Sequence, residues 1–202
     1  MKLEIPFFRQ TTLFNCGPSA LRMVLAYFEK DPGIKILEEK TGIKEGKAVF
    51  TIKLGTVAKS FGYSANFFSK SLKFNSQYLE MNYYKKYGSG NEASELDILV
   101  DEAKKAGVNV QEKTIDINQL LNFVSEKSVP IVLLDWNIVE DRKDKGYQGH
   151  FVVIAGYDKK NVYVQNPSSA DTIGLTSISR ELFDKARKSN GTDEDIVIIY
   201  KK

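Results

Sequence analysis

The only cysteine of this 202-residue chain, Cys16, stands where the sequence predicts the start of a helix. Gly17 and Pro18 follow it, and proline is tolerated in a first helical turn, where its missing N–H is not needed. Apolar residues then recur at spacings of three and four, the pattern of an amphipathic helix: Leu21, Val24, Leu25 and Phe28. Unpaired N–H groups and the helix dipole favour a thiolate at such a position. We therefore expect a lowered pKa and a nucleophilic role for Cys16, the alternative being a small buried side chain.

Three further residues would complete the chemistry of a nucleophilic cysteine. His150, the only histidine, opens an apolar predicted strand, and Asn166 follows the next strand. If the loop between these strands spans residues 156–160, His150 lies opposite Asn166 on one face of the hairpin. A loop of another length would place the two side chains on opposite faces. In the first case Asn166 would orient His150 as the base for Cys16, and the amide N–H of Gln10 would face an oxyanion.

Each of these residues also has a non-catalytic interpretation. His150 could be a half-buried histidine with satisfied hydrogen bonds. Asn166 precedes Pro167 and suits any turn, and Gln10 could lie on the surface. Asp158 is a second candidate for the third catalytic group, although its position favours a turn.

Four more residues are candidates for substrate contacts. Trp136 and Asn137 follow a predicted buried strand and could line a pocket, the alternative for the tryptophan being a place in the core. Asn15 and Gly149 stand directly before the predicted nucleophile and base. We expect no cofactor and no metal site, because one cysteine and one histidine give no ligand cluster.

Composition narrows the class of protein. The 29 basic and 26 acidic residues give a net charge of +3, which is too balanced to favour nucleic acid or an anionic membrane as partner. A single cysteine allows no internal disulfide and suits a reducing compartment. We find no signal-peptide pattern and no apolar run near the ~20 residues of a spanning helix. We therefore expect a cytoplasmic protein.

The order of predicted elements favours an α+β protein, because helices dominate the first half and strands the second. No repeat or linker is found, so we expect one domain over residues 1–202. Residues 3–8 suggest a short edge strand. Residues 70–92 are rich in tyrosine, end in the loop Gly88-Ser89-Gly90-Asn91 and match no element. We expect them to form a family-specific insert that sets substrate selectivity. The helices are expected at 16–29, 34–40, 51–61, 94–106, 116–124 and 180–188, and the strands at 64–69, 108–115, 131–134, 149–154, 162–165 and 196–200.

Several motifs carry a resemblance to known families. Phe14-Asn15-Cys16-Gly17-Pro18-Ser19-Ala20-Leu21 resembles the nucleophile segment of the bacteriocin-processing cysteine peptidases and their papain-like relatives. Residues 146–153, 165–171 and 186–195 resemble the guanylyl cyclase domain-containing proteins of animals and plants, and that match spans nearly the whole chain. The resemblance implies a papain-like peptidase fold under a cyclase name. The bacteriocin-processing enzymes carry Asp-Pro where this chain has Asn166-Pro167, and they add a membrane and ATPase module that this sequence does not contain.

The residues thus favour a papain-like cysteine hydrolase acting on a peptide or a small amide. One alternative, implied by the resemblance, is a guanylyl cyclase; another is a binding module without turnover. A cyclase usually needs paired carboxylates for Mg²⁺ and a phosphate cradle. Asp193, Glu194 and Asp195 are consecutive, which gives a poor pair, and no Gly-x4-Gly-Lys-Ser/Thr loop occurs. We expect an acidic turn at these residues and little cyclase activity.

Overall fold

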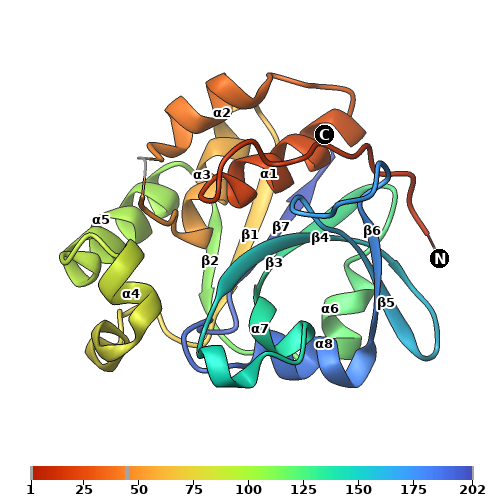
Figure 1. The fold of residues 1–202 in the computed structure, drawn as a ribbon. Coiled ribbons are helices and arrows are strands. Elements are labelled where there is room, and N and C mark those ends of the chain that lie inside the picture. Colours follow the sequence, from red (N-terminus) through yellow and green to blue (C-terminus); the bar gives the residue numbers. More distant parts are fainter. Residues whose placement is uncertain (1, 44–45, 202) are drawn as a thin grey trace.

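A seven-stranded sheet runs through the computed structural model, which describes residues 2–43 and 46–201, and helices pack around it (Figure 1). The helices are α1 (Cys16–Tyr27), α2 (Ile34–Thr41), α3 (Thr51–Ser60), α4 (Asn82–Tyr87), α5 (Glu92–Lys105), α6 (Ile117–Asn122), α7 (Trp136–Val139) and α8 (Arg180–Arg187), with 3₁₀ turns η1 (Ser76–Glu80) and η2 (Lys143–Lys145). The strands are β1 (Ser64–Ser69), β2 (Asn109–Glu112), β3 (Ser128–Asp135), β4 (Gly149–Tyr157), β5 (Asn161–Gln165), β6 (Leu175–Ser179) and β7 (Ile196–Tyr200).

The sheet is mainly antiparallel, as predicted. Its strand order is β2-β1-β7-β3-β4-β5-β6, and only β1 and β2 run parallel. Helix α1 packs on β4, α3 packs on β1 and β7, and α8 packs on β3. The longest described helix, α5, has 14 residues, and none of the described helices is long and apolar enough to cross a membrane.

The N-terminal end of α1 is pressed against β4, and Gly17 makes this approach possible. A Cβ atom at Gly17 would lie 2.8 Å from Val49 Cγ1 and 3.2 Å from the ring of Phe151. Real Cβ atoms essentially never come within 3.0 Å of a neighbour, so a larger residue would require Val49 or the helix to shift. The glycine therefore holds Cys16 close to the first residues of β4.

The expectation for the first residues of the chain is wrong. Residues 3–8 form no strand; only Lys2 makes an isolated bridge, to Gly156, and the Leu3 N–H donates to the carbonyl of Ala155. Proline at position 6 has no N–H to extend this pairing.

The segment of residues 70–92, which matched no element in the sequence, contains η1 and α4. Aromatic contacts fix it in place: Tyr84 stacks on Tyr147 with the ring centroids 6.0 Å apart, and its hydroxyl donates to the carbonyl of Gly191 at 3.0 Å. These contacts join residues more than sixty positions apart, and a local pattern does not reveal them.

The hairpin of β4 and β5 contains a bulge. Near the turn, Tyr157 pairs with Val162, whereas Val153 pairs with Gln165, so the register shifts by one residue around Ala155. A bulge inserts one unpaired residue and exchanges the faces of the residues beyond it. The expected register, with a loop at residues 156–160, is therefore wrong, because the turn is shorter and the strand carries an extra residue.

Candidate active site

The structure brings His150 and Asn166 together. His150 Nε2 lies 2.8 Å from Asn166 Oδ1, and both side chains are buried. Val153 pairs with Gln165 beyond the bulge, and the alternation of side chains along the two strands puts His150 and Asn166 on the same face. The bulge and the shorter turn thus offset one another, and the two side chains meet although the predicted register fails.

Ser168 fixes the orientation of this pair. Its backbone N–H and its hydroxyl both donate to Asn166 Oδ1, at 3.0 and 2.9 Å. These donors require an oxygen at that position and not the amide nitrogen. The same oxygen then accepts from Nε2–H of His150, so Nδ1 is the ring nitrogen with the free lone pair.

Cys16 is the first residue of α1, and its sulfur faces backbone N–H groups of Phe151, Gly17 and Cys16 itself. Burial nevertheless raises the pKa of the thiol above its ordinary value of 9.0, and the N–H groups offset this only in part. The expected lowering of the pKa is wrong, because loss of water around the sulfur outweighs the helix terminus. Burial likewise lowers the pKa of His150 to about 4, against the opposing effect of the hydrogen bond that its Nε2–H donates to Asn166. At neutral pH both groups are therefore uncharged.

Gln10 lies beside the loop that follows Asn166. Its backbone N–H donates to the carbonyl of Pro167 at 2.9 Å, and its side-chain Nε2 donates to the carbonyl of Thr12 at 2.8 Å. Within the part of the chain that the structure describes, the buried Oε1 has no hydrogen-bond partner. One of the two side-chain N–H bonds of Gln10 is thus committed to the loop before Cys16, and the oxyanion role stays a prediction.

Trp136 packs edge-on against His150, with ring centroids 5.0 Å apart and planes 62° apart. Such an aromatic edge excludes water from one side of the imidazole. The neighbouring Asn137 donates from Nδ2 to the carbonyl of Gly146 at 2.9 Å and lines a separate hollow.

Asn15 and Gly149 lie where the sequence placed them, next to Cys16 and His150. The buried side chain of Asn15 holds its own loop together, since its Oδ1 accepts from Thr11 and Thr12 and its Nδ2 donates to Glu38. A substrate contact for either residue stays a prediction.

Two tyrosines, Tyr83 from the segment of residues 70–92 and Tyr147 from the loop before β4, lie against the residue before His150. The hydroxyls of Tyr147 and Tyr83 come within 2.7 and 3.0 Å of the Cβ position of Gly149. The pKa of Tyr83 is raised by burial and by its interaction with Cys16, which places that tyrosine near the thiol. Sequence reasoning missed Tyr83 and Ser168; the run of tyrosines and the Asn-Pro-Ser turn were the available signals, but neither indicates a partner.

The acidic run near the C-terminus forms a turn, as predicted, and its carboxylates have different partners. Asp193 and Glu194 have positive φ angles of 47° and 55°. Asp193 accepts from the hydroxyl of Tyr78 at 2.7 Å and, like Asp195, lines a cavity, whereas Glu194 faces the buried Arg187. The described residues contain no group of three or more His, Cys, Asp or Glu side chains arranged to hold a metal ion.

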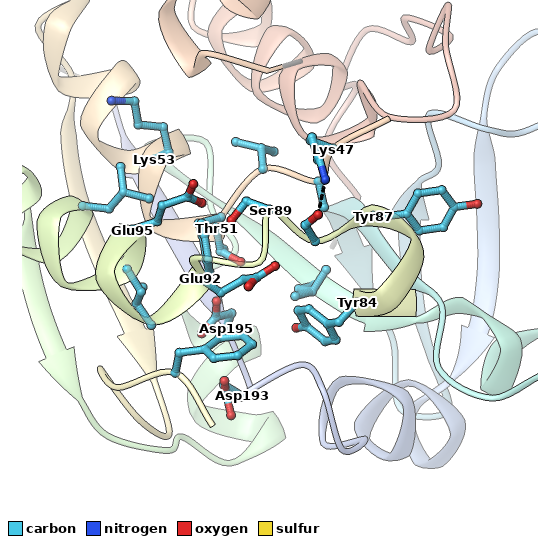
Figure 2. A pocket seen from close by; sticks show the side chains of 18 of the residues that line it. Lys47, Thr51, Lys53, Tyr84, Tyr87, Ser89, Glu92, Glu95, Asp193 and Asp195 are labelled. Carbon is cyan, nitrogen blue, oxygen red and sulfur yellow. Dashed lines mark hydrogen bonds between the residues drawn. The ribbon is translucent and has the colours of Figure 1, made fainter. Parts of the chain in front are cut away.

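That cavity, of about 730 Å³, lies between α3, α4 and α5 (Figure 2). Cys16 and His150 are not among the residues that line it, whereas Phe151 and Tyr83 are. The candidate active site and the cavity are therefore neighbours that share a wall.

The fold is that of the papain-like cysteine peptidases. The chain superposes over its whole length on a C39-like peptidase from Bacillus anthracis, with a TM-score of 0.62, 16% identity and 98% coverage of that chain. A double-glycine-motif protease of an AMS/PCAT transporter, solved with its leader peptide, matches over 100% of this chain and 94% of that one, with a TM-score of 0.55 and 16% identity. The peptidase domain of Streptococcus ComA matches with a TM-score of 0.53 and 13% identity, over 98% of this chain and 99% of that one.

Within this fold, the chain belongs to the guanylylate cyclase family, whose profile matches residues 5–199. It is similar to Guanylyl cyclase 1 of Arabidopsis thaliana, with 25% identity over 218 residues, 98% of this chain and 76% of the plant protein. The resemblance found in the sequence, a peptidase fold under a cyclase name, is confirmed.

Proposed function

We propose that the protein is a cysteine hydrolase of the peptidase or amidase type, with Cys16 as nucleophile and His150 as base. The observation that carries this proposal is the buried hydrogen bond of 2.8 Å between His150 Nε2 and Asn166 Oδ1. This hydrogen bond leaves Nδ1 of His150 as the proton acceptor. The next residue along the chain, Phe151, directs its backbone N–H at the sulfur of Cys16. A nucleophile, a base and an orienting group are the minimum set for acyl transfer.

In the proposed reaction, His150 Nδ1 takes the thiol proton as the sulfur of Cys16 attacks the acyl carbon. The negative charge on the carbonyl oxygen would be stabilised by backbone N–H at the start of α1 and by the second side-chain N–H of Gln10. The imidazolium then returns its proton to the leaving nitrogen as the C–N bond breaks. Water, deprotonated by His150, hydrolyses the thioester and restores the thiol. The lowered pKa of His150 leaves the base free of a proton before the substrate arrives and also makes it a weaker base, so the proton must move together with the attack on the acyl carbon.

A peptide is the substrate class best supported. One structural neighbour is solved with a leader peptide, and that is a property of the neighbour. In this chain the free cysteine suits a reducing, cytoplasmic setting. The cover formed by Tyr83 is where a peptide would have to enter.

4-Nitrophenyl acetate tests the proposal without knowledge of the natural substrate. We expect a burst of nitrophenol and an acetyl group on Cys16, located by mass spectrometry. Cys16→Ser is the matched control and should show neither. Asn166→Ala should slow acetylation by part of the ~10²–10⁴-fold that a positioned base supplies, and Asn166→Asp should retain or raise it, because a carboxylate also stabilises imidazolium. Equal acetylation rates for the parent, His150→Ala and Asn166→Ala would leave a binding module as the better description.

Cyclisation of GTP is the second candidate, and family membership is the observation that favours it. Two of the three acids are engaged, Asp193 by the hydroxyl of Tyr78 and Glu194 by Arg187, and the described residues hold no group of three side chains arranged for a metal, which weighs against a paired metal site. Cyclic GMP formed from GTP with Mg²⁺ or Mn²⁺, and lost on replacing all three residues with alanine in a folded protein, would reverse the ranking.

A further inference from the structure

The cavity between α3, α4 and α5 is lined by carboxylates and aromatic rings that take no part in the reaction described above. Its size, about 730 Å³, lies within the range of pockets that hold a small ligand. The side chains that matter for its chemistry are Phe74, Tyr84, Glu92, Asp193 and Asp195.

One carboxylate oxygen of Glu92 is buried at this cavity without a hydrogen-bond partner among the described residues. The residue is 4% exposed, and its Oε1 accepts from the Gly90 N–H at 3.2 Å. Among the described residues, the buried Oε2 has no hydrogen-bond partner. Figure 2 shows the carboxylate directed into the middle of the cavity, between Tyr84 and Asp195. A buried carboxylate oxygen without a partner is costly, and a bound hydrogen-bond donor would remove that cost.

The nearby lysines do not supply this donor. Lys47 donates to the carbonyl of Gly88, and Lys53 pairs with Glu102 at 3.2 Å. A second acid, Asp195, faces the same space, and burial raises its pKa to about 7. The cavity thus has acceptors from two acidic residues on opposite elements, α5 and the turn before β7, and no described cation between them.

We propose that this cavity binds the guanidinium or ammonium group of an arginine or lysine side chain in the substrate peptide. A cationic donor matches the unpartnered Oε2 of Glu92, and a planar guanidinium can bond a second acceptor, such as the carboxylate of Asp195, at the same time. The rings of Phe74 and Tyr84 offer faces and edges that suit a cation and its aliphatic stem. The cation site stands on the cavity itself; its role as a substrate pocket rests on the proposed hydrolase function.

The position of the cavity relative to Cys16 supports the substrate role. Phe151 lines the cavity with its side chain and meets the sulfur of Cys16 with its backbone N–H. Val49, another wall residue, lies against the Cβ position of Gly17. A long basic side chain held by Glu92 and Asp195 would therefore belong to a residue close to the bond that Cys16 attacks.

A charged compound and its neutral isostere test the inference on Cys16→Ala protein, which cannot turn over a substrate. N-acetyl-arginine amide and N-acetyl-citrulline amide differ in charge at nearly constant shape, and their Kd values can be measured by calorimetry. We expect the arginine compound to bind at least about tenfold more tightly, the equivalent of one charge-assisted hydrogen bond. Glu92→Gln and Asp195→Asn should each reduce that preference. Asp97→Asn, an exposed change on the same helix, should keep it.

Equal Kd values for the two compounds, or a preference that survives both substitutions in the cavity, would overturn the inference. So would guanosine binding more tightly than the arginine compound, since a base with ring N–H donors would then be the better occupant. The isostere comparison needs no substitution in the cavity, so misfolding of a variant cannot decide it. Acetylation of the parent by 4-nitrophenyl acetate is scored separately: its success together with equal Kd values would reject the pocket and keep the hydrolase.

Discussion

Two buried polar regions share the wall formed by Phe151, and they differ in how their polar atoms are satisfied. In the region of His150, Asn166 and Ser168, each hydrogen bond fixes the orientation of the next group. In the cavity, Glu92 Oε2 is buried without a partner among the described residues. A satisfied network holds groups in one geometry, as catalysis requires, whereas an unsatisfied acceptor marks a place for something that binds. This is the difference expected between the reaction centre and the recognition pocket that we propose.

Loss of His150 should give the largest effect. In His150→Ala, the rate of Cys16 acetylation by 4-nitrophenyl acetate should fall about 10²–10⁴-fold, because no other base takes the thiol proton. Stopped-flow release of nitrophenol measures this rate. Asp97→Asn serves as the control and should match the parent. An unchanged rate in His150→Ala would turn the satisfied region into a structural one and remove the contrast.

The two regions should also give pH dependences of stability with opposite signs. Because the fold lowers the pKa of His150, this residue contributes stability that is fully present above pH 6.5, its ordinary pKa. That contribution is lost as the pH falls through about 4. Its size is on the order of 3 kcal/mol. Because the fold raises the pKa of Asp195, this residue contributes stability that is fully present below pH 3.8, its ordinary pKa. That contribution is lost as the pH rises through about 7.

Urea unfolding across this pH range can resolve the two contributions. Relative to the parent, His150→Gln should remove a gain of stability with rising pH, and Asp195→Asn should remove a loss. His150 is the only histidine, so the first difference has one source. Parallel pH profiles for both variants would mean that neither group is held neutral by the fold.

Substitutions that remove one polar group should change stability in opposite directions in the two regions. Asn166→Ala leaves His150 without its buried partner and should cost about 1–3 kcal/mol. Glu92→Gln removes a buried charge but keeps an acceptor for the Gly90 N–H, and should gain about 1 kcal/mol. Unfolding free energies from urea titration at one pH compare them. A loss in both variants would show that Glu92 is satisfied in the free protein.

The smallest effect concerns the shared boundary. The residue Cys16 is only 8% exposed. Tyr83→Ala should uncover its sulfur and speed alkylation by iodoacetamide several-fold. Tyr78→Phe, a change in the same segment away from the thiol, is the control. If Tyr83→Ala is alkylated at the parental rate, another element covers the site.

The sequence was sufficient for the parts of the molecule that depend on local pattern. The helix after Cys16 and most strands followed from apolar spacing, and the antiparallel sheet followed from the order of elements. The segment of residues 70–92 did not, because its tyrosines are held by distant partners such as Tyr147 and Gly191. Local signals cannot report such contacts.

The candidate site was predictable in composition but not in electrostatics. The types and order of Cys16, His150 and Asn166 suggested the grouping, and the last two do meet. The direction of the Cys16 pKa was missed, since a helix terminus is visible in a sequence and the extent of burial is not. Glu92 was missed for a related reason: an acid in a first helical turn is ordinary, and only the fold shows that its second oxygen is buried without a partner.

The bulge at Ala155 has a consequence for how this hairpin can vary. Strands are pleated with a period of two residues, so one extra residue shifts the phase of everything beyond it by half a period. The turn at residues 158–160 sets an initial phase, and the bulge inverts it before the strand reaches His150. A change of one residue in the turn can therefore replace the bulge. A relative without the bulge needs a turn longer or shorter by one residue to keep its histidine and asparagine on the same face. While the bulge is present, the turn can lengthen or shorten only in pairs of residues.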